Sequence, residues 1–230
     1  MLSKRKKYLN LLIRIIKRIV FGPFDNFLKD SNGVIHIGAN IGQEKDHYKK
    51  FKVKRVLWIE ADPNTFKKLK KNIKQYKNQK ALNYLLNNKK KNIIFNVSNF
   101  GGNASSIFNF SEHKKMHPDV KFTKKIMLKS YTFEEMIAKE RIIIKDYNTL
   151  IMDTQGSELL ILKGAKKFIH QFKYIKLETS DYEIYKKAPI LKTITSFLKL
   201  HNFTEKKKIK IDESKNGGSV FDILYKKNLT

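Results

Sequence analysis

The stretch VIHIGANIGQEKDHYKKF, residues Val34 to Phe51, decides the fold of this chain. A short run rich in β-branched residues leads into a Gly-Ala-Asn-Ile-Gly turn, and a polar stretch of helical character follows it. Glycine tolerates positive φ and lets a ligand approach the main chain closely. A helix that begins after such a turn offers its free N–H groups. The stretch predicts a strand, a turn and a helix, with a ligand bound against the backbone of the turn. The alternative is a tight turn that uses glycine for steric reasons alone.

Strands and helices alternate along the rest of the chain. This alternation predicts an α/β fold with a mostly parallel sheet and helices on both faces. We expect strands at Val34–Ile37, Arg55–Glu60, Ala81–Leu86, Ile93–Val97, Ile126–Ser130, Thr149–Met152 and Tyr174–Leu177, and a terminal antiparallel pair at Phe203–Ile209 and Val220–Tyr225. We expect helices at Gln43–Phe51, Pro63–Tyr76, Thr132–Lys139, Glu158–Gln171 and Ile190–His201, and a long, largely irregular loop at Phe100–Lys125.

The composition is that of one globular domain. The chain has 230 residues, of which 41% are hydrophobic, and this length is enough to bury a core. It contains no cysteine, which excludes disulfides and thiolate metal sites. No His/Asp cluster has the spacing of metal ligands, so we expect no metal.

The formal net charge of +28 points to an anionic partner, either nucleic acid or a membrane surface. All but five of the 49 basic residues are lysine, however, and Asn, Ile, Phe and Tyr are also abundant. These residue types share AT-rich codons, so base composition accounts for much of the charge. Proteins that read phosphates or bases favour arginine forks. Nucleic acid is therefore not the partner that we expect.

The first 21 residues, MLSKRKKYLNLLIRIIKRIVF, form a basic amphipathic segment. Charges at Arg14, Lys17 and Arg18 interrupt the apolar run, so it does not resemble a signal peptide and is too charged to span a bilayer. Such a helix either lies on an anionic membrane or packs on its own domain. We divide the chain into this segment, residues 1–30, and one folded domain, residues 31–230. We expect the protein in the cytoplasm, with the inner face of the membrane as the alternative.

A carboxylate ends the second predicted strand. Glu60 follows the glycine turn at about the 20-residue separation expected between a glycine loop and a carboxylate that binds ribose hydroxyls. A solvated Glu60 in a loop next to a helix cap at Asp62 is the alternative. The loop lacks the Gly-Lys-Ser/Thr of a phosphate loop and the third glycine of the dinucleotide fingerprint. Together, the turn and Glu60 predict a ligand that contains a nucleoside.

Two later strands also end in acids, at Asp153 and Glu178. Ligands on a parallel sheet bind beyond the carboxyl ends of its strands, so these acids belong to the same edge as Glu60. Burial without a partner raises the pKa of a carboxyl group and makes it a candidate general base. The alternative for each acid is a helix cap or a loop acceptor. Glu158 comes early in the following helix, where its charge suits the helix dipole.

Five segments together resemble the FkbM-type S-adenosylmethionine-dependent methyltransferases. They are IHIGANIGQE, LWIEADP, NVSNFGGNASSI, LIMDTQGSELLILKGA and IKLETSDYEIYKKAP, and the resemblance runs from about Val34 to about Tyr225. The segment from Asp153 to Gly164 is its most specific part. The resemblance implies a Rossmann-like class I methyltransferase fold, with a seven-stranded sheet whose last strand is antiparallel. It also implies S-adenosylmethionine as cofactor and methylation of hydroxyls on sugars, surface glycans or related metabolites.

The same resemblance assigns roles to individual residues. The cofactor loop would contain Gly38, Asn40 and Gly42, with His36 just before it where many methyltransferases have an acid; His36 could instead be a hydrogen-bonded core residue. Glu60 would hold the ribose and Asn87 would lie near the adenine. The acceptor side would contain the acids Asp153, Glu158 and Glu178 as candidate catalytic residues and Ser98, Gly102 and Ser105 as substrate-binding residues.

Transfer of a methyl group to oxygen needs alignment of the reacting atoms and a base that removes the hydroxyl proton. Asp153 is the first candidate for this base, ahead of Glu178 and Glu158, while His113 and His117 in the long loop could contact substrate. The partner is then a small-molecule or glycan substrate. Two other functions compete: an RNA methyltransferase, suggested by the charge, and a non-catalytic binding protein with the same fold.

Overall fold

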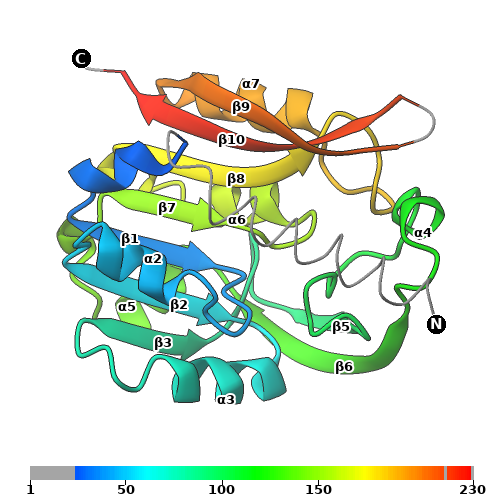
Figure 1. Cartoon of the computed structure of the whole chain (residues 1–230), viewed down its shortest axis with the longest axis horizontal. Helices are drawn as coiled ribbons and strands as arrows, with labels where there is room; N and C mark the ends of the chain where they lie inside the picture. Colours follow the sequence, from blue (N-terminus) through cyan, green and yellow to red (C-terminus); the bar gives the residue numbers. More distant parts are fainter. Residues whose placement is uncertain (1–23, 215–216, 229–230) are drawn as a thin grey trace.

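The computed structural model describes residues 24–214 and 217–228 of the chain (Figure 1). The predicted amphipathic helix of residues 1–21 therefore lies outside the described residues. The main sheet consists of β1 (Gly33–Ile37), β2 (Arg55–Glu60), β3 (Gln79–Asn83), β7 (Thr149–Met152), β8 (Tyr174–Ser180), β9 (Phe203–Glu213) and β10 (Ser219–Lys227). The helices are η1 (Asp25–Asp30), α2 (Lys45–Lys50), α3 (Pro63–Asn72), α4 (His113–Met116), α5 (Phe133–Lys139), α6 (Glu158–Gly164) and α7 (Leu191–Leu200), with short turns η2 (Ile144–Asp146) and η3 (Ile169–Gln171).

The main sheet has seven strands in the order β3-β2-β1-β7-β8-β10-β9. Neighbouring strands from β3 to β8 are parallel, whereas β10 runs antiparallel to both β8 and β9. This arrangement confirms the predicted α/β fold with an antiparallel last strand. The chain builds the sheet outward from β1 in one direction, through β2 and β3, and then continues on the other side of β1 with β7. The connections after β1 and β7 therefore leave in opposite directions, and ligands of such sheets bind at this point, beyond the carboxyl end of β1.

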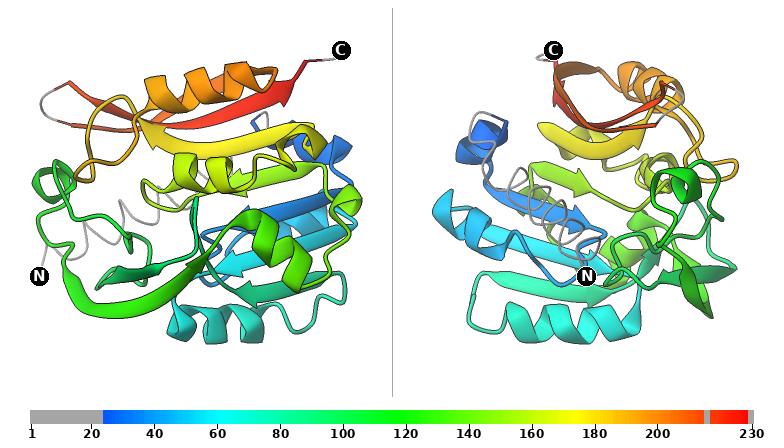
Figure 2. Two further views of the ribbon diagram at one scale, coloured as in Figure 1. Left: turned by 180° about the vertical axis from the view of Figure 1, so that it is seen from behind. Right: turned by 45° about the vertical axis from the view of Figure 1, so that its right-hand side comes forward.

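Helices cover both faces of the sheet (Figure 2). On one face, α5, α6 and α7 pack on a core that includes Ile35 and Ile37 of β1. On the other face, η1, α2 and α3 pack on a core that includes Val34 of β1 and Trp58 of β2. All five residues of β1 are buried, as expected for a strand that is covered on both sides. The two cores fix β1, and with it the turn at its carboxyl end.

A second, smaller sheet lies beside the carboxyl ends of the main strands (Figures 1 and 2). It consists of β4 (Leu85–Leu86), β5 (Asn92–Ser98) and β6 (Phe122–Tyr131) in the order β4-β6-β5. The prediction of one strand over Ala81–Leu86 was therefore wrong. The strand leaves the main sheet after Asn83, and Leu85 and Leu86 pair with β6 instead.

Other boundaries also differ from the predicted ones: for example, α3 ends at Asn72 and not at Tyr76, and β9 continues to Glu213. Helix α6 ends at Gly164, and Ile169–Gln171 form the separate turn η3. Gly164 lies against the Asn87 carbonyl, since a Cβ at position 164 would be only 2.3 Å from that oxygen. Strand β8 continues to Ser180, so Glu178 lies within the strand and not at its end. The predicted loop at Phe100–Lys125 contains α4 and the first residues of β6.

The hydrophobic segment that precedes β1 packs on the domain. Phe24, Phe27 and Leu28, in and beside η1, are all buried in the same core as Trp58. The part of residues 1–30 that the structure describes is thus in contact with the sheet. None of the helices in residues 24–214 and 217–228 has both the length and the apolar character needed to cross a bilayer.

Candidate active site

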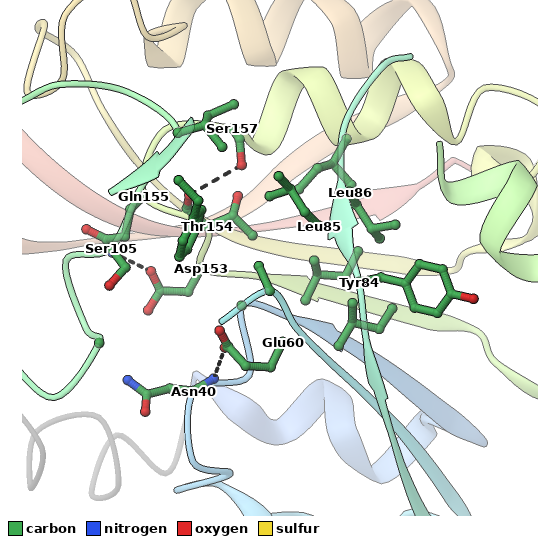
Figure 3. A pocket seen from close by; sticks show the side chains of 18 of the residues that line it. Asn40, Glu60, Tyr84, Leu85, Leu86, Ser105, Asp153, Thr154, Gln155 and Ser157 are labelled. Atoms are coloured by element: carbon green, nitrogen blue, oxygen red, sulfur yellow. Dashed lines mark hydrogen bonds between the residues drawn. The ribbon is translucent and has the colours of Figure 1, made fainter. Parts of the chain in front are cut away.

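A pocket lies at the carboxyl ends of β1, β2 and β7, with the small sheet as one of its walls (Figure 3). Three residues that the sequence analysis placed on separate strand ends, Asn40, Glu60 and Asp153, all line it. The other lining residues are Ile37, Gly38, Ile59, Ala61, Tyr84, Leu85, Leu86, Phe95, Gly102, Asn103, Ser105, Ile107, Thr154, Gln155, Ser157 and Ile161. The topology therefore brings the predicted nucleoside side and the predicted acceptor side into one cavity.

The turn after β1 is held tightly against the end of β7. Gly38 has a φ of +78°, and a Cβ at this position would lie 2.0 Å from the carbonyl oxygen of Asp153. Only glycine allows this approach, because it has both the φ freedom and no side chain. The two strand ends that carry Asn40 and Asp153 are consequently packed backbone to backbone.

Glu60 is bound by the glycine turn and by its own loop. One carboxylate oxygen accepts a hydrogen bond from the Asn40 N–H at 2.8 Å, and the other accepts from the Asp62 N–H at 2.8 Å. Burial, as the largest effect, raises the pKa of Glu60 to about 7, while these backbone hydrogen bonds oppose the rise. Each oxygen of an ionised carboxylate can accept a further hydrogen bond. Glu60 can therefore accept hydrogen bonds from two ribose hydroxyls without releasing the turn.

The side chain of Asn40 connects the glycine turn to the loop after β5. Its Nδ2 donates to the Gly101 carbonyl at 3.2 Å and to Asn103 Oδ1 at 2.7 Å, which fixes the orientation of the amide. The Asn40 Oδ1 is buried and has no hydrogen-bond partner in the described structure. A buried acceptor of this kind is costly unless a donor reaches it. The cationic amino group of a bound cofactor would be such a donor.

Asp153 lies at the centre of a polar network that the sequence analysis only partly anticipated. Gln155 Nε2 donates to Asp153 Oδ1 at 2.6 Å and lies 3.4 Å from Glu178 Oε1. The Tyr185 hydroxyl donates to Gln155 Oε1, which fixes the direction of the Gln155 amide. Gln155 has a φ of +55°, and Ser106 Oγ donates to its carbonyl. Gln155 thus holds two predicted catalytic acids in a defined arrangement.

Glu158 faces its own turn and is not among the pocket-lining residues. Its carboxylate accepts from the N–H and the hydroxyl of Thr154, at 2.8 and 2.9 Å, and from the Gly156 N–H at 3.1 Å. Burial raises the pKa of Glu158 to about 7. The residue therefore shapes the turn that carries Asp153 and Gln155. Glu178, on β8, is half-buried and also lies outside the pocket lining, with its Oε1 3.4 Å from Gln155 Nε2.

Three residues assigned to the cofactor side do not line the pocket. Gly42 has a φ of +74° and faces α3, where a Cβ would meet Leu69 at 2.8 Å. His36 is buried in the core, stacks on Trp58 and shares a hydrogen bond of 2.9 Å with the Tyr48 hydroxyl. Asn87 is buried directly after β4, where its N–H donates to the Tyr131 carbonyl of β6 and its side-chain Nδ2 has no partner in the described structure.

The three residues assigned to the substrate lie in and beside the loop after β5. Gly102 and Ser105 line the pocket, whereas Ser98 is buried and does not. Ser98 Oγ accepts from the Ala104 N–H at 3.3 Å, and the Ser98 N–H donates to Ser105 Oγ at 3.0 Å. Ser98 thus holds the loop that brings Gly102 and Ser105 to the pocket.

The two histidines of the long loop are part of a separate cluster. His113 stacks on Phe110, and His117 Nε2 lies within hydrogen-bond distance of Asp212 Oδ2 of β9, at 3.0 Å. Neither lines the pocket. Within residues 24–214 and 217–228, no group of three or more His, Asp or Glu side chains could hold a metal ion.

An apolar wall faces the Glu60 side of the pocket. It includes Tyr84, Leu85 and Leu86 (Figure 3), and the other apolar side chains that line the pocket are Phe95, Ile107 and Ile161, with Ile37 and Ile59. A flat, largely apolar ring such as adenine suits this wall, since apolar side chains line most small-molecule sites. Sequence reasoning missed these residues, although the hydrophobic run Leu85-Leu86 just before Asn87 was a signal that could have found them.

The fold and the pocket together are those of a class I methyltransferase: a seven-stranded sheet with an antiparallel last strand, a glycine turn after β1, and a buried carboxylate at the end of β2. The family profile described as the methyltransferase FkbM domain matches residues 36–205, which is more than half of the chain. The chain belongs to this family. It is a methyltransferase, and its cofactor is S-adenosylmethionine.

Individual proteins are similar to the chain at low identity. The 2-O-methyltransferase NoeI of Sinorhizobium fredii (strain NBRC 101917 / NGR234) is 22% identical over 172 residues, which are 72% of this chain and 70% of that protein. TrmK of M. capricolum, solved in complex with S-adenosyl-homocysteine, is 12% identical with a TM-score of 0.50; the match covers 85% of this chain and 62% of that one. A structure from Listeria monocytogenes serotype 4b is 9% identical with a TM-score of 0.50, covering 86% and 62%. The chain thus spans less than two thirds of the length of these two solved structures, and their likeness concerns the fold.

Proposed function

We propose that the protein transfers the methyl group of S-adenosylmethionine to a hydroxyl of a sugar, surface glycan or related metabolite. The observation that carries this proposal is the position of Asp153, which lines the same pocket as Glu60 and is held by Gln155. A half-buried carboxylate so fixed is suited to accept the proton of a neutral hydroxyl. The similarity to a 2-O-methyltransferase supports oxygen as the acceptor atom.

The charge of the pocket supports a neutral acceptor. Among the described residues that line it, two are carboxylates, Glu60 and Asp153, and none is a lysine or an arginine. This is notable in a chain with a net charge of +28. An acceptor that carries phosphate next to the reacting hydroxyl would meet repulsion there, whereas a neutral or amino sugar would not. The pocket thus favours a sugar hydroxyl over an RNA acceptor.

In the proposed reaction, the chain binds the cofactor, orients the acceptor hydroxyl and removes the proton of that hydroxyl. When bound, S-adenosylmethionine supplies an electrophilic methyl group on a positively charged sulfur. Glu60 and Asn40 would hold the cofactor by its ribose and its amino group. Asp153 would take the proton of the acceptor hydroxyl as the new O–CH3 bond forms and the S–CH3 bond breaks. S-adenosylhomocysteine and the methyl ether are the products, and the proton remains on Asp153 until solvent takes it. Alignment of the three reacting atoms supplies most of the rate enhancement.

The test is methyl transfer from isotope-labelled S-adenosylmethionine to a panel of acceptors. The panel contains neutral sugars and glycosides, amino sugars, sugar phosphates and total tRNA. We expect label in base-stable methyl ethers of neutral or amino sugars. Labelling of tRNA alone would overturn the proposal in favour of an RNA methyltransferase. Absence of S-adenosylhomocysteine binding by calorimetry would overturn it in favour of a non-catalytic binding protein.

A further inference from the structure

The outer face of the β5–β6 hairpin carries an exposed pair of apolar side chains. Ile94 is 49% exposed and Met127 is 63% exposed, and they belong to the few large hydrophobic residues with such exposure in the described structure. The two residues are direct partners in the antiparallel ladder of β5 and β6. Partners in such a ladder stand side by side on one face of the sheet. They therefore form a small continuous apolar surface in contact with water.

Lysines surround this apolar pair. Lys125 and Lys129 are each two residues from Met127, so they share its face of β6, and both are exposed. Lys89, Lys90 and Lys91, also exposed, lead into β5. The segments 88–98 and 121–131 contain seven lysines and no Asp or Glu. The face defined by Ile94, Met127, Lys125 and Lys129, here named the hairpin face, is thus apolar at its centre and positively charged around it.

An anionic bilayer is the partner that this chemistry fits. Exposed apolar side chains gain free energy by leaving water for the acyl boundary, and lysines around them are attracted to anionic headgroups. A nucleic-acid surface would instead be expected to present arginine forks and stacking aromatic rings. The hairpin face contains neither, since its exposed residues are aliphatic and its cations are lysines.

We propose that the hairpin face docks the protein on an anionic phospholipid membrane. The opposite face of β5 carries Phe95, which lines the pocket. One strand thus separates the docking face from the active site, and the small sheet stands at the carboxyl edge of the main sheet (Figure 2). Docking would bring the pocket close to the bilayer surface, where acceptors attached to lipid are found. Only this last step rests on the proposed function, because docking itself requires no catalysis.

Co-sedimentation of the full chain with lipid vesicles tests the proposal. Vesicles of phosphatidylcholine alone are compared with vesicles that also contain phosphatidylglycerol. The double variant Lys125→Glu/Lys129→Glu should bind anionic vesicles at least about 25-fold more weakly than the wild type, from about fivefold for each lysine lost. The matched control is Lys67→Glu/Lys70→Glu on the exposed face of α3, which has the same net charge. Residues 1–21 are unchanged in both variants, so their contribution to vesicle binding is the same.

A second pair of variants tests the apolar centre without a change in charge. Ile94→Thr/Met127→Gln should weaken binding to anionic vesicles about tenfold, from the lost burial of aliphatic carbon. Its control is Ile143→Thr/Leu200→Gln, which replaces two exposed apolar residues elsewhere on the surface. Equal vesicle binding by each variant and its control would overturn the proposal. So would a hairpin variant that loses tRNA binding but retains vesicle binding. S-adenosylhomocysteine binding is measured in parallel. A protein that binds S-adenosylhomocysteine but shows no preference of the hairpin face for anionic vesicles contradicts the docking proposal alone and leaves the proposed function intact.

Discussion

The Gln155 side-chain nitrogen lies 2.6 Å from Asp153 Oδ1, and this contact connects the turn after β7 to the proposed chemistry. Tyr185, which lies outside this turn, fixes the orientation of the Gln155 amide, because its hydroxyl donates to Gln155 Oε1. The amide cannot rotate without the loss of both hydrogen bonds. Asp153 therefore has a fixed position at the edge of the pocket, which is what a general base needs.

Substitution of Gln155 should reduce turnover more than cofactor binding. Gln155→Leu keeps the bulk of the side chain but removes the donor to Asp153, and we expect kcat to fall by about 10- to 100-fold. The dissociation constant for S-adenosylhomocysteine should change by less than about threefold, since Glu60 is untouched. Tyr185→Phe is the milder comparison, because it removes only the hydroxyl. Steady-state kinetics and calorimetry measure both quantities, and an unchanged kcat in Gln155→Leu would contradict the positioning role.

Asp153→Asn should abolish turnover while the cofactor still binds. Asparagine has nearly the same shape but cannot take a proton, so we expect kcat to fall by at least about 100-fold. Single-turnover methyl transfer gives the rate, and calorimetry with S-adenosylhomocysteine gives the affinity. If affinity disappeared together with activity, Asp153 would be a cofactor ligand and not the base.

Cofactor affinity should depend on pH through Glu60. The pKa of this carboxyl group is about 7 in the folded protein, so the ionised form, which accepts two hydroxyls best, is lost as the pH falls through 7. From about pH 8 to about pH 6 the ionised fraction drops roughly tenfold, and the affinity for S-adenosylhomocysteine should drop with it. Calorimetry across this range measures the effect. Glu60→Gln should bind weakly at every pH, and the same pH slope in this variant would refute the assignment.

The Glu158 carboxylate should contribute to stability more than to chemistry. Its removal in Glu158→Ala leaves buried donors from Thr154 and Gly156 without a partner, at a cost of about 2 to 4 kcal/mol in the free energy of unfolding. Urea denaturation measures this loss. Glu134→Ala, the removal of a more exposed helix carboxylate on α5, serves as the control and should cost less than about 1 kcal/mol. Comparable losses in both variants would show that Glu158 does not hold the turn.

A comparison of two glycine variants separates the steric effect of the close contact at Gly38 from the effect of its positive φ. Gly38→Ala combines a positive φ with a Cβ placed 2.0 Å from the Asp153 carbonyl oxygen, whereas Gly101→Ala combines a positive φ with open space. Gly101→Ala should cost about 1 kcal/mol of stability. Gly38→Ala should cost several times more and weaken cofactor binding, because the two strand ends must separate. Denaturation and calorimetry on both variants test this, and equal behaviour would mean that the contact is not needed.

Much of the site could be predicted because it depends on where parallel strands end. Glu60 is the last residue of β2, Asn40 and Asp153 follow β1 and β7, and parallel strands bring their carboxyl ends to one edge. The separation of glycine turn and Glu60 was a further signal. Each of these patterns can be recognised in a short stretch of sequence, and the parallel sheet then brings the residues close together in space.

The rest depends on contacts between distant segments. The space beside Gly42 is filled by Leu69 of α3, and no local sequence pattern records this contact. The role of Gln155 needs a left-handed backbone at that residue and a partner, Tyr185, that lies thirty residues further on. The departure of Leu85 and Leu86 into a second sheet depends on their pairing with β6.

A crystal structure of the complex with S-adenosylhomocysteine tests the central claim most directly. The account predicts that both ribose hydroxyls donate to Glu60, that the amino group reaches Asn40 Oδ1, and that the sulfur points toward Asp153. A ligand bound elsewhere on the protein, or one whose ribose does not contact Glu60, would contradict the account.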